Sequence, residues 1–153
     1  MPKVPPVHAE FQVPMKSKYV SLVRKGVRSL AYGAGFNEED CCDIEVAVGE
    51  AVTNAICHGQ PKSGAGCLRV RCHADSGYLH IEVEDEGRAA CIPLPTRIPD
   101  LNDEHGRGWF LIHRLMDGVC VKCTDRGLLV QMIKQRHRNK NVKRHLSSIA
   151  AMA

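Results

Sequence analysis

The spacing of hydrophobic residues between positions 37 and 59 predicts a long amphipathic helix. The apolar positions follow the helical order i, i+3, i+4, i+7 and i+11, and they are Ile44, Ala47, Val48, Ala51 and Ala55. This period of about 3.6 residues is typical of a helix that packs one face on a core. Asn37, followed by three acidic residues, has the composition of a capped helix start, and Gly59, with a proline two residues later, that of a helix end.

The remaining patterns predict further helices and paired strands. Helical periodicity indicates helices at residues 16–32 and 109–116, and alternation indicates strands at residues 8–13, 68–72, 78–85, 118–124 and 128–134. Residues 87–105 are rich in proline and have no period, and a loop of that length in a compact domain is usually functional. Helices followed by strand pairs and a closing hairpin predict an α+β two-layer sandwich.

The bulk composition is that of one globular domain. The chain has 153 residues, of which 44% are hydrophobic, enough for a single core. We expect an N-terminal extension at residues 1–7, a domain at residues 8–134 and a basic tail at residues 135–153. Because no apolar run is long enough to cross a membrane and the first residues lack the apolar core of a secretory signal, we expect a cytoplasmic protein. The eight cysteines are scattered through the predicted elements, which favours reduced thiols.

Two local features allow other functions. Cys120 and Cys123 form a Cys-x-x-Cys pair, but zinc ribbons need a second ligand pair, and the chain has no second pair of this spacing. The basic residues from Lys134 to Arg144 could dock on nucleic acid or an acidic partner, although a solvated tail is the more common outcome of such composition. Because few aromatic residues accompany these charges, we do not expect direct binding of nucleic acid.

A carboxylate and a carboxamide lie one turn apart on the long predicted helix. Glu50 and Asn54 fall beside the apolar stripe, at the boundary of the core, where a cleft would use them. A carboxylate can accept a proton or hold a metal ion, and an amide oxygen can coordinate a hard cation such as Mg²⁺. A solvated polar face is the alternative interpretation, but Asn is a poor residue for a helix interior, which favours a functional role.

Two glycine motifs follow downstream. Asp85 and Gly87 form an Asp-x-Gly motif at the end of a predicted strand, where the carboxylate could accept a hydrogen bond from an exocyclic amine. Gly106, Arg107 and Gly108 open a predicted helix, whose free N–H groups would suit a phosphate. Each motif also occurs as an ordinary turn or helix start, so neither is specific by itself.

The order of these motifs resembles the GHKL superfamily of gyrase, heat-shock ATPases, histidine kinases and MutL. The sequence around Glu50 and around Gly106 is similar to that of the bacterial anti-sigma-factor serine kinases, and the resemblance covers roughly residues 8–134. It implies the GHKL (Bergerat) form of the α+β sandwich, with a mixed, mainly antiparallel sheet and helices on one face. It further implies an ATP- and Mg²⁺-dependent serine/threonine protein kinase.

The resemblance also implies a role for individual residues. Glu50 takes the position of the catalytic base, and Asn54 that of the Mg²⁺ ligand beside the ATP phosphates. Asp85 takes the position that binds the adenine amine, with Gly87 shaping the pocket. The glycine box that closes on the phosphates comprises Gly106 and Gly108, and the segment between it and Asp85 is the ATP lid. From position alone, His105 and Arg107 would add positive charge near the γ-phosphate.

The partners that the resemblance implies are a sigma factor, which the kinase sequesters, and an anti-anti-sigma protein, whose serine receives the phosphate. Family members are often homodimers. One departure is Ala89, which stands where the superfamily often has a second glycine, so that lid closure could differ. The alternative function is therefore a nucleotide-gated binding module that holds a regulatory protein without catalysis. A histidine-kinase catalytic domain is disfavoured because no helices with a phospho-accepting histidine precede the motifs.

Overall fold

A computed structural model describes residues 6–59, 61, 65–75, 77–87 and 106–137 of the chain. The elements are β1 (Val7–Pro14), the 3-10 turn η1 (Ser17–Tyr19), α1 (Val20–Gly33), α2 (Glu38–His58), β2 (Cys67–Asp75), β3 (Tyr78–Glu84), α3 (Arg107–Leu115), β4 (Gly118–Cys123) and β5 (Leu128–Gln135). Every helix and strand that the sequence predicts is present, with ends shifted by a few residues. The predicted lid, His105, Ala89 and most of the basic tail lie outside the described residues.

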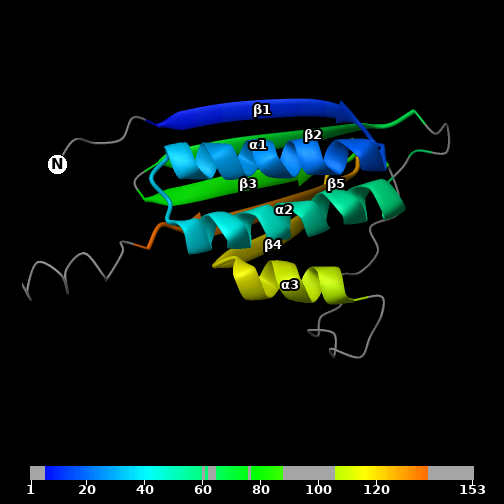
Figure 1. The fold of residues 1–153 in the computed structure, drawn as a ribbon. Helices are drawn as coiled ribbons and strands as arrows, with labels where there is room; N and C mark the ends of the chain where they lie inside the picture. The colour runs from blue at the N-terminus through cyan, green and yellow to red at the C-terminus, as the bar shows by residue number, and fades with distance from the viewer. Residues whose placement is uncertain (1–5, 60, 62–64, 76, 88–105, 138–153) are drawn as a thin grey trace, which may run out of the picture.

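The strands form one sheet in the order β1-β2-β3-β5-β4. All four pairings are antiparallel, so the described residues contain no parallel pair. The three helices lie on one face of this sheet, with α2 between α1 and α3 (Figure 1). The predicted α+β two-layer sandwich with helices on one face is therefore confirmed.

The core lies between the helices and the sheet, and α2 contributes most to it. The whole apolar stripe of α2, from Ile44 to Ala55, is buried, as its period predicts. Alternate residues of β2 and β3, such as Val70 and Ile81, meet it from the sheet. The Asn37 side chain accepts a hydrogen bond of 2.7 Å from the Asp40 amide, which caps the helix start.

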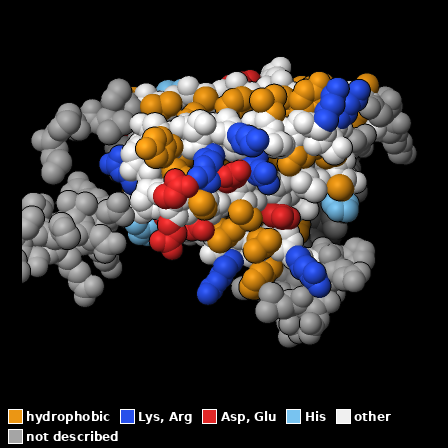
Figure 2. All heavy atoms as spheres, in the orientation of Figure 1, with side chains coloured by type: hydrophobic (Ala, Val, Ile, Leu, Met, Phe, Trp, Pro, Cys, Tyr) orange, Lys and Arg blue, Asp and Glu red, His pale blue; other side chains and the backbone are white. Residues whose placement is uncertain are grey.

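The outer surface of the helical layer carries charges of both signs over α1 and α2 (Figure 2). Arg28 of α1 pairs there with Glu38 and Glu45 of α2. This arrangement is that of a solvated helix pair, with the apolar faces turned inward. No helix among the described residues has the length and apolar character that crossing a bilayer requires.

A buried lysine ties the start of α2 to the far end of the chain. Lys134 of β5, 6% exposed, donates to Asp43 over 2.8 Å and to the Leu115 carbonyl over 2.7 Å, and its Nζ lies 3.7 Å from Asp40. Beyond β5, the His137 amide donates to Asp40. The end of the described chain is therefore packed against the helical layer rather than free of it.

Candidate functional site

The polar pair of α2 lies against the first turn of α3. A β-carbon built on Gly108 would lie 2.8 Å from Glu50 Oε2 and 3.4 Å from each amide atom of Asn54. Because an added β-carbon would force the Glu50 carboxylate to shift, glycine lets the two helices approach with the Glu50 side chain in its present position. The sequence places Glu50 and Asn54 on one face of α2, and the structure adds that this face meets the Gly106–Gly108 motif.

Asn54 has an unused polar atom at this junction. Its Nδ2 is buried and has no hydrogen-bond partner among the described residues. Buried polar groups are nearly always paired in proteins, and each exception calls for an explanation. A carboxamide held in this way, beside a carboxylate, has capacity left for a ligand.

The start of α3 has no side-chain cap among the described residues. Gly106 is the N-cap residue, and it supplies no side-chain hydrogen bond to the helix. The first N–H groups of an uncapped helix are unsatisfied and lie at the positive end of the helix dipole, which suits an anion. Arg107 is exposed beside them. The role of Arg107 beside a phosphate stays a prediction, and His105 lies outside the described residues.

Asp85 follows β3 and is 4% exposed. Its Oδ1 accepts hydrogen bonds of 3.0 Å from the Gly87 amide and from the Leu128 amide of β5. Burial raises the pKa of Asp85 above its ordinary value, and the two backbone hydrogen bonds partly offset that shift. One oxygen is thus committed to the backbone, which fixes the orientation of the carboxyl group.

Three glycines form the walls around Asp85. A β-carbon on Gly59 or on Gly127 would overlap the Asp85 carboxyl group, and one on Gly87 would overlap the backbone of Gly59. The end of α2, the Asp-x-Gly motif and the β4–β5 turn therefore meet at one point. Sequence analysis identified Gly87 alone as a pocket residue. Gly59 and Gly127 carried only the signals of a helix end and a hairpin turn.

The two clusters lie along the C-terminal half of α2. Glu50 and Asn54 occupy successive turns, and Gly59, which packs against the Asp85 carboxyl group, closes the helix. The rise of 1.5 Å per residue separates Glu50 from Gly59 by about 14 Å. A single elongated ligand with a heterocyclic ring at one end and phosphates at the other could reach both clusters.

A cleft of about 720 Å³ lies elsewhere, on the sheet face that the helices leave open. Its lining residues include His8, His73 and His80, and none of the candidate site residues.

No group of three metal-ligating side chains suited to a metal ion occurs within the described ranges, so they offer no support for zinc at the Cys-x-x-Cys pair. The expectation of reduced thiols is wrong at Cys123, which is disulfide-bonded, and is met at the free cysteines, which are Cys41, Cys42, Cys57, Cys67, Cys72 and Cys120.

Comparison with known proteins places this geometry in a family. The model of the histidine kinase-like ATPase domain matches residues 13–134. The serine-protein kinase RsbW of Listeria innocua is 33% identical over 92% of this chain and 94% of its own length. The chain belongs to the RsbW group of histidine kinase-like ATPase domains. The RsbW of Halalkalibacterium halodurans, 34% identical over 88% of this chain and 87% of its own length, is a further relative. Membership of an ATPase and kinase family implies nucleotide binding.

Solved structures agree on the fold of this RsbW-type chain. The RsbU and RsbW domains of a Mycobacterium tuberculosis protein superpose with a TM-score of 0.66 at 20% identity, over 88% of this chain and 33% of that one. A histidine kinase domain from Erythrobacter litoralis superposes with a TM-score of 0.54 at 20% identity, over 81% of this chain and 62% of that one. The chain spans about a third of the first of these proteins, and at this identity both likenesses concern the fold.

Proposed function

We propose that this protein is an ATP-dependent serine kinase and anti-sigma factor. It transfers the γ-phosphate of ATP to a serine of an anti-anti-sigma protein, and it sequesters a sigma factor when that antagonist is phosphorylated. The observation that carries the proposal is the contact of Glu50 and Asn54 with Gly108, at the start of an uncapped helix. Family membership supports the same activity, since the relatives are serine-protein kinases.

Glu50 is the proposed base. The serine oxygen forms a bond to the γ-phosphorus, the bond from that phosphorus to the departing ADP oxygen breaks, and the serine proton passes to the Glu50 carboxylate. Phosphoryl transfer depends mainly on positioning and charge neutralisation. The backbone N–H groups at the start of α3, together with Arg107, lie where they would neutralise phosphate charge.

Asn54 is the proposed protein ligand for Mg²⁺. Its carboxamide fits that role, because it stands at the α2–α3 junction beside Glu50 and has an oxygen donor of the kind that Mg²⁺ prefers. When bound, the ion would neutralise charge on the phosphates. Mg²⁺ usually keeps several waters and phosphate oxygens among its ligands, so one side chain is sufficient.

Asp85 is the proposed adenine-binding residue. Backbone donors hold its Oδ1, and the glycine walls leave Oδ2 directed toward Gly59. A fixed carboxylate accepts a hydrogen bond from an exocyclic amine and discriminates against bases that lack one. The absence of side chains at Gly59, Gly87 and Gly127 lets these three backbone segments pack closely around the Asp85 carboxyl group and fix its position.

The test is a transfer assay with the full chain, Mg²⁺, ATP labelled at the γ-phosphate and the anti-anti-sigma protein from the same genome. We expect label on one serine of the antagonist. Glu50→Gln should reduce transfer by a factor of about 100 or more while ATP still binds. Glu39→Gln, which changes an exposed carboxylate of the same helix, should transfer as the unchanged protein does. An unlabelled antagonist in the presence of bound ATP would instead favour the nucleotide-gated binding module that Ala89 suggests.

The wider setting is proposed on the same basis. The kinase would act in the cytoplasm, where its sigma factor and antagonist are found, and it would form a homodimer.

A further inference from the structure

We propose that Arg126 is a positioning residue that sets the orientation of Asp85 and thereby the preference of the site for adenine. The proposal rests on the function proposed above for Asp85. Arg126 lies in the β4–β5 turn, outside every motif that the sequence analysis identified, and its guanidinium bridges the two carboxylates that flank Asp85 in the chain.

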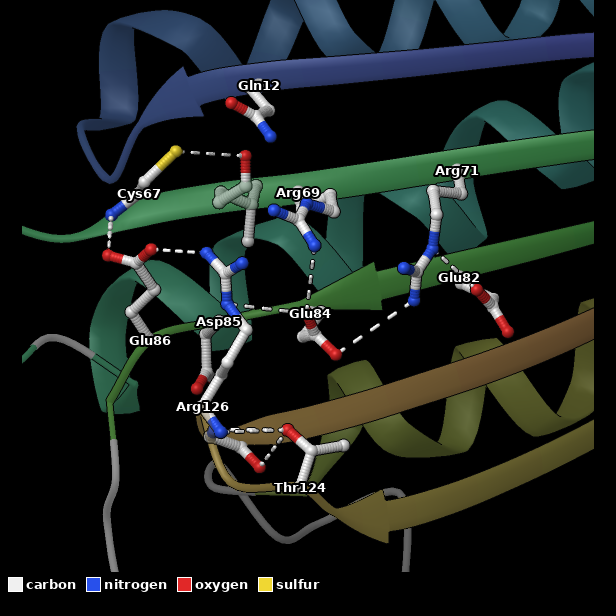
Figure 3. Close-up of polar contacts among 12 residues, drawn as sticks. Gln12, Cys67, Arg69, Arg71, Glu82, Glu84, Asp85, Glu86, Thr124 and Arg126 are labelled. Atoms are coloured by element: carbon white, nitrogen blue, oxygen red, sulfur yellow. Dashed lines mark hydrogen bonds and ion pairs between the residues drawn. The ribbon is translucent and has the colours of Figure 1, made fainter.

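The first contact of Arg126 is with Glu86, the middle residue of the Asp-x-Gly motif. Arg126 Nη2 donates to Glu86 Oε1, and the other oxygen, Glu86 Oε2, accepts a hydrogen bond of 3.1 Å from the Cys67 amide at the start of β2 (Figure 3). The residue between Asp85 and Gly87 is therefore held from both sides. Rotation of the Asp-x-Gly backbone would break both contacts.

The second contact is with Glu84, the residue before Asp85. Arg126 Nε lies 3.6 Å from Glu84 Oε1. The Glu84 side chain is only 8% exposed, and two arginines of β2 also approach it, with Arg69 at 3.8 Å and Arg71 at 3.9 Å (Figure 3). A carboxylate buried to this extent needs such charges, and removing one of them leaves the others to compensate.

Alternation along the strand explains why this arrangement bears on Asp85. The residues of β3 with odd numbers, such as Val83, are buried under the helices, and Glu82 and Glu84 belong to the open face. Asp85 continues the buried series, so its carboxyl group faces the helical layer. Arg126 thus holds the backbone from the open side of the sheet, while the Asp85 carboxyl group lies on the helical side, against Gly59.

The turn that carries Arg126 also supplies the groups that touch Asp85. Gly127 packs against the Asp85 carboxyl group, and the Leu128 amide donates to its Oδ1. Thr124 closes the turn, because its Oγ1 accepts hydrogen bonds of 3.3 Å from the Arg126 amide and 3.2 Å from the Gly127 amide. The guanidinium therefore fixes the turn relative to the strand end, and the turn fixes the carboxyl group.

The test compares two nucleotides by calorimetry in the presence of Mg²⁺. One is ATP, and the other is purine riboside triphosphate, which lacks the exocyclic amine. Arg126→Gln should weaken ATP binding about tenfold, the factor that corresponds to about 1.4 kcal/mol. The same variant should change binding of the amine-free nucleotide less than about twofold, because no hydrogen bond from that base reaches Asp85.

Arg71→Gln is the matched control. Arg71 lies on the same face and also approaches Glu84, but its second partner is Glu82, over 2.7 Å, rather than Glu86. We expect Arg71→Gln to bind both nucleotides as the unchanged protein does. Glu86→Gln, a second variant, removes the carboxylate that pairs with Arg126 and should reproduce the ATP-specific weakening. In an Asp85→Asn background, Arg126→Gln should cause no further loss.

The outcomes separate the inference from the proposed function. Equal weakening of the two nucleotides by Arg126→Gln would mean a general structural role and would overturn the inference. The inference would also be overturned if Arg126→Gln bound ATP like the unchanged protein while Asp85→Asn bound it weakly. In that case the function proposed for Asp85 would stand. If Asp85→Asn binds ATP like the unchanged protein, the adenine contact itself is wrong and the inference falls with it.

Discussion

Gly108 faces Glu50 so closely across the α2–α3 junction that a β-carbon would lie 2.8 Å from the carboxylate oxygen Oε2. We therefore expect Gly108→Ala to displace the proposed base or the start of α3. Phosphoryl transfer should fall by a factor of about 100, since displacements of about 1 Å at a reacting centre have effects of that size. Single-turnover transfer assays measure this change directly.

The stability of Gly108→Ala should not fall together with its phosphoryl-transfer activity. Alanine favours a helix over glycine by about 1 kcal/mol, which offsets part of the local strain. Gly33→Ala is the control, because a β-carbon at Gly33, in the last turn of α1, meets no atom within 4 Å. Full activity in Gly108→Ala would show that the junction does not position Glu50.

Gly127 is another position where a β-carbon would overlap the site. Its β-carbon would overlap the Asp85 carboxyl group, whereas one on Gly118, also at the β4–β5 hairpin, would make ordinary contacts at 3.7 Å and 3.9 Å. Gly127→Ala should weaken ATP binding at least tenfold, and Gly118→Ala should leave it unchanged. Equal affinities in the two variants, measured by calorimetry, would remove the β4–β5 turn from the nucleotide pocket.

The raised pKa of Asp85 gives stability a defined dependence on pH. Because burial is the main cause of the shift, the folded protein binds this proton more tightly than the unfolded chain does. The free energy of unfolding therefore falls as the pH rises from the ordinary pKa of 3.8 through the raised value. Asp85→Asn keeps an oxygen for the backbone donors and does not ionise, so it avoids this loss.

We expect Asp85→Asn to melt at or above the temperature of the unchanged protein at neutral pH, although it binds ATP weakly. The difference between the two melting temperatures should shrink as the pH falls to about 4. Thermal melts across this range, without nucleotide, provide the comparison. A variant that is less stable at neutral pH would show that the Asp85 carboxylate serves the fold rather than the ligand.

Lys134 provides a test of the fold that is independent of nucleotide. Lys134→Met removes the cation that joins Asp43, Asp40 and the Leu115 carbonyl, and the two carboxylates are left without it. Loss of one partner from such a buried group costs about 3 kcal/mol. Urea denaturation should detect this loss, and Lys122→Met, at an exposed lysine of β4, should change stability by less than about 0.5 kcal/mol. Similar midpoints for the two variants would contradict the buried network.

Local patterns in the sequence were sufficient to predict the elements and the layer arrangement. The stripe from Ile44 to Ala55 indicated the buried face of α2 because helical periodicity reports packing directly. The same periodicity placed Glu50 and Asn54 side by side. Their partner across the junction, Gly108, was identified through resemblance to a family, since no local rule relates residues 50 and 108.

The parts of the site that were missed depend on contacts between distant residues. Gly59 and Gly127 have the local signals of a helix end and a turn. The contact of Gly127 with Asp85 arises when β3 and β5 pair, and that of Gly59 when α2 packs on the sheet. Arg126 is likewise an ordinary hairpin residue until it lies between Glu84 and Glu86. Asp43 is an acidic residue of α2 like Glu50, yet it pairs with Lys134 of β5, a contact that helical spacing alone does not indicate.

The central claim is that one nucleotide bridges the Asp85 pocket and the Glu50–Asn54 junction along α2. Calorimetric titration of ATP into the full chain, with and without Mg²⁺, tests it most directly when repeated on Asn54→Ala and Asp85→Asn. We predict that Mg²⁺ strengthens ATP binding to the unchanged protein, that Asn54→Ala loses this enhancement, and that Asp85→Asn weakens binding in both conditions. ATP affinity that is the same in all three proteins, with Mg²⁺ or without it, would contradict the account.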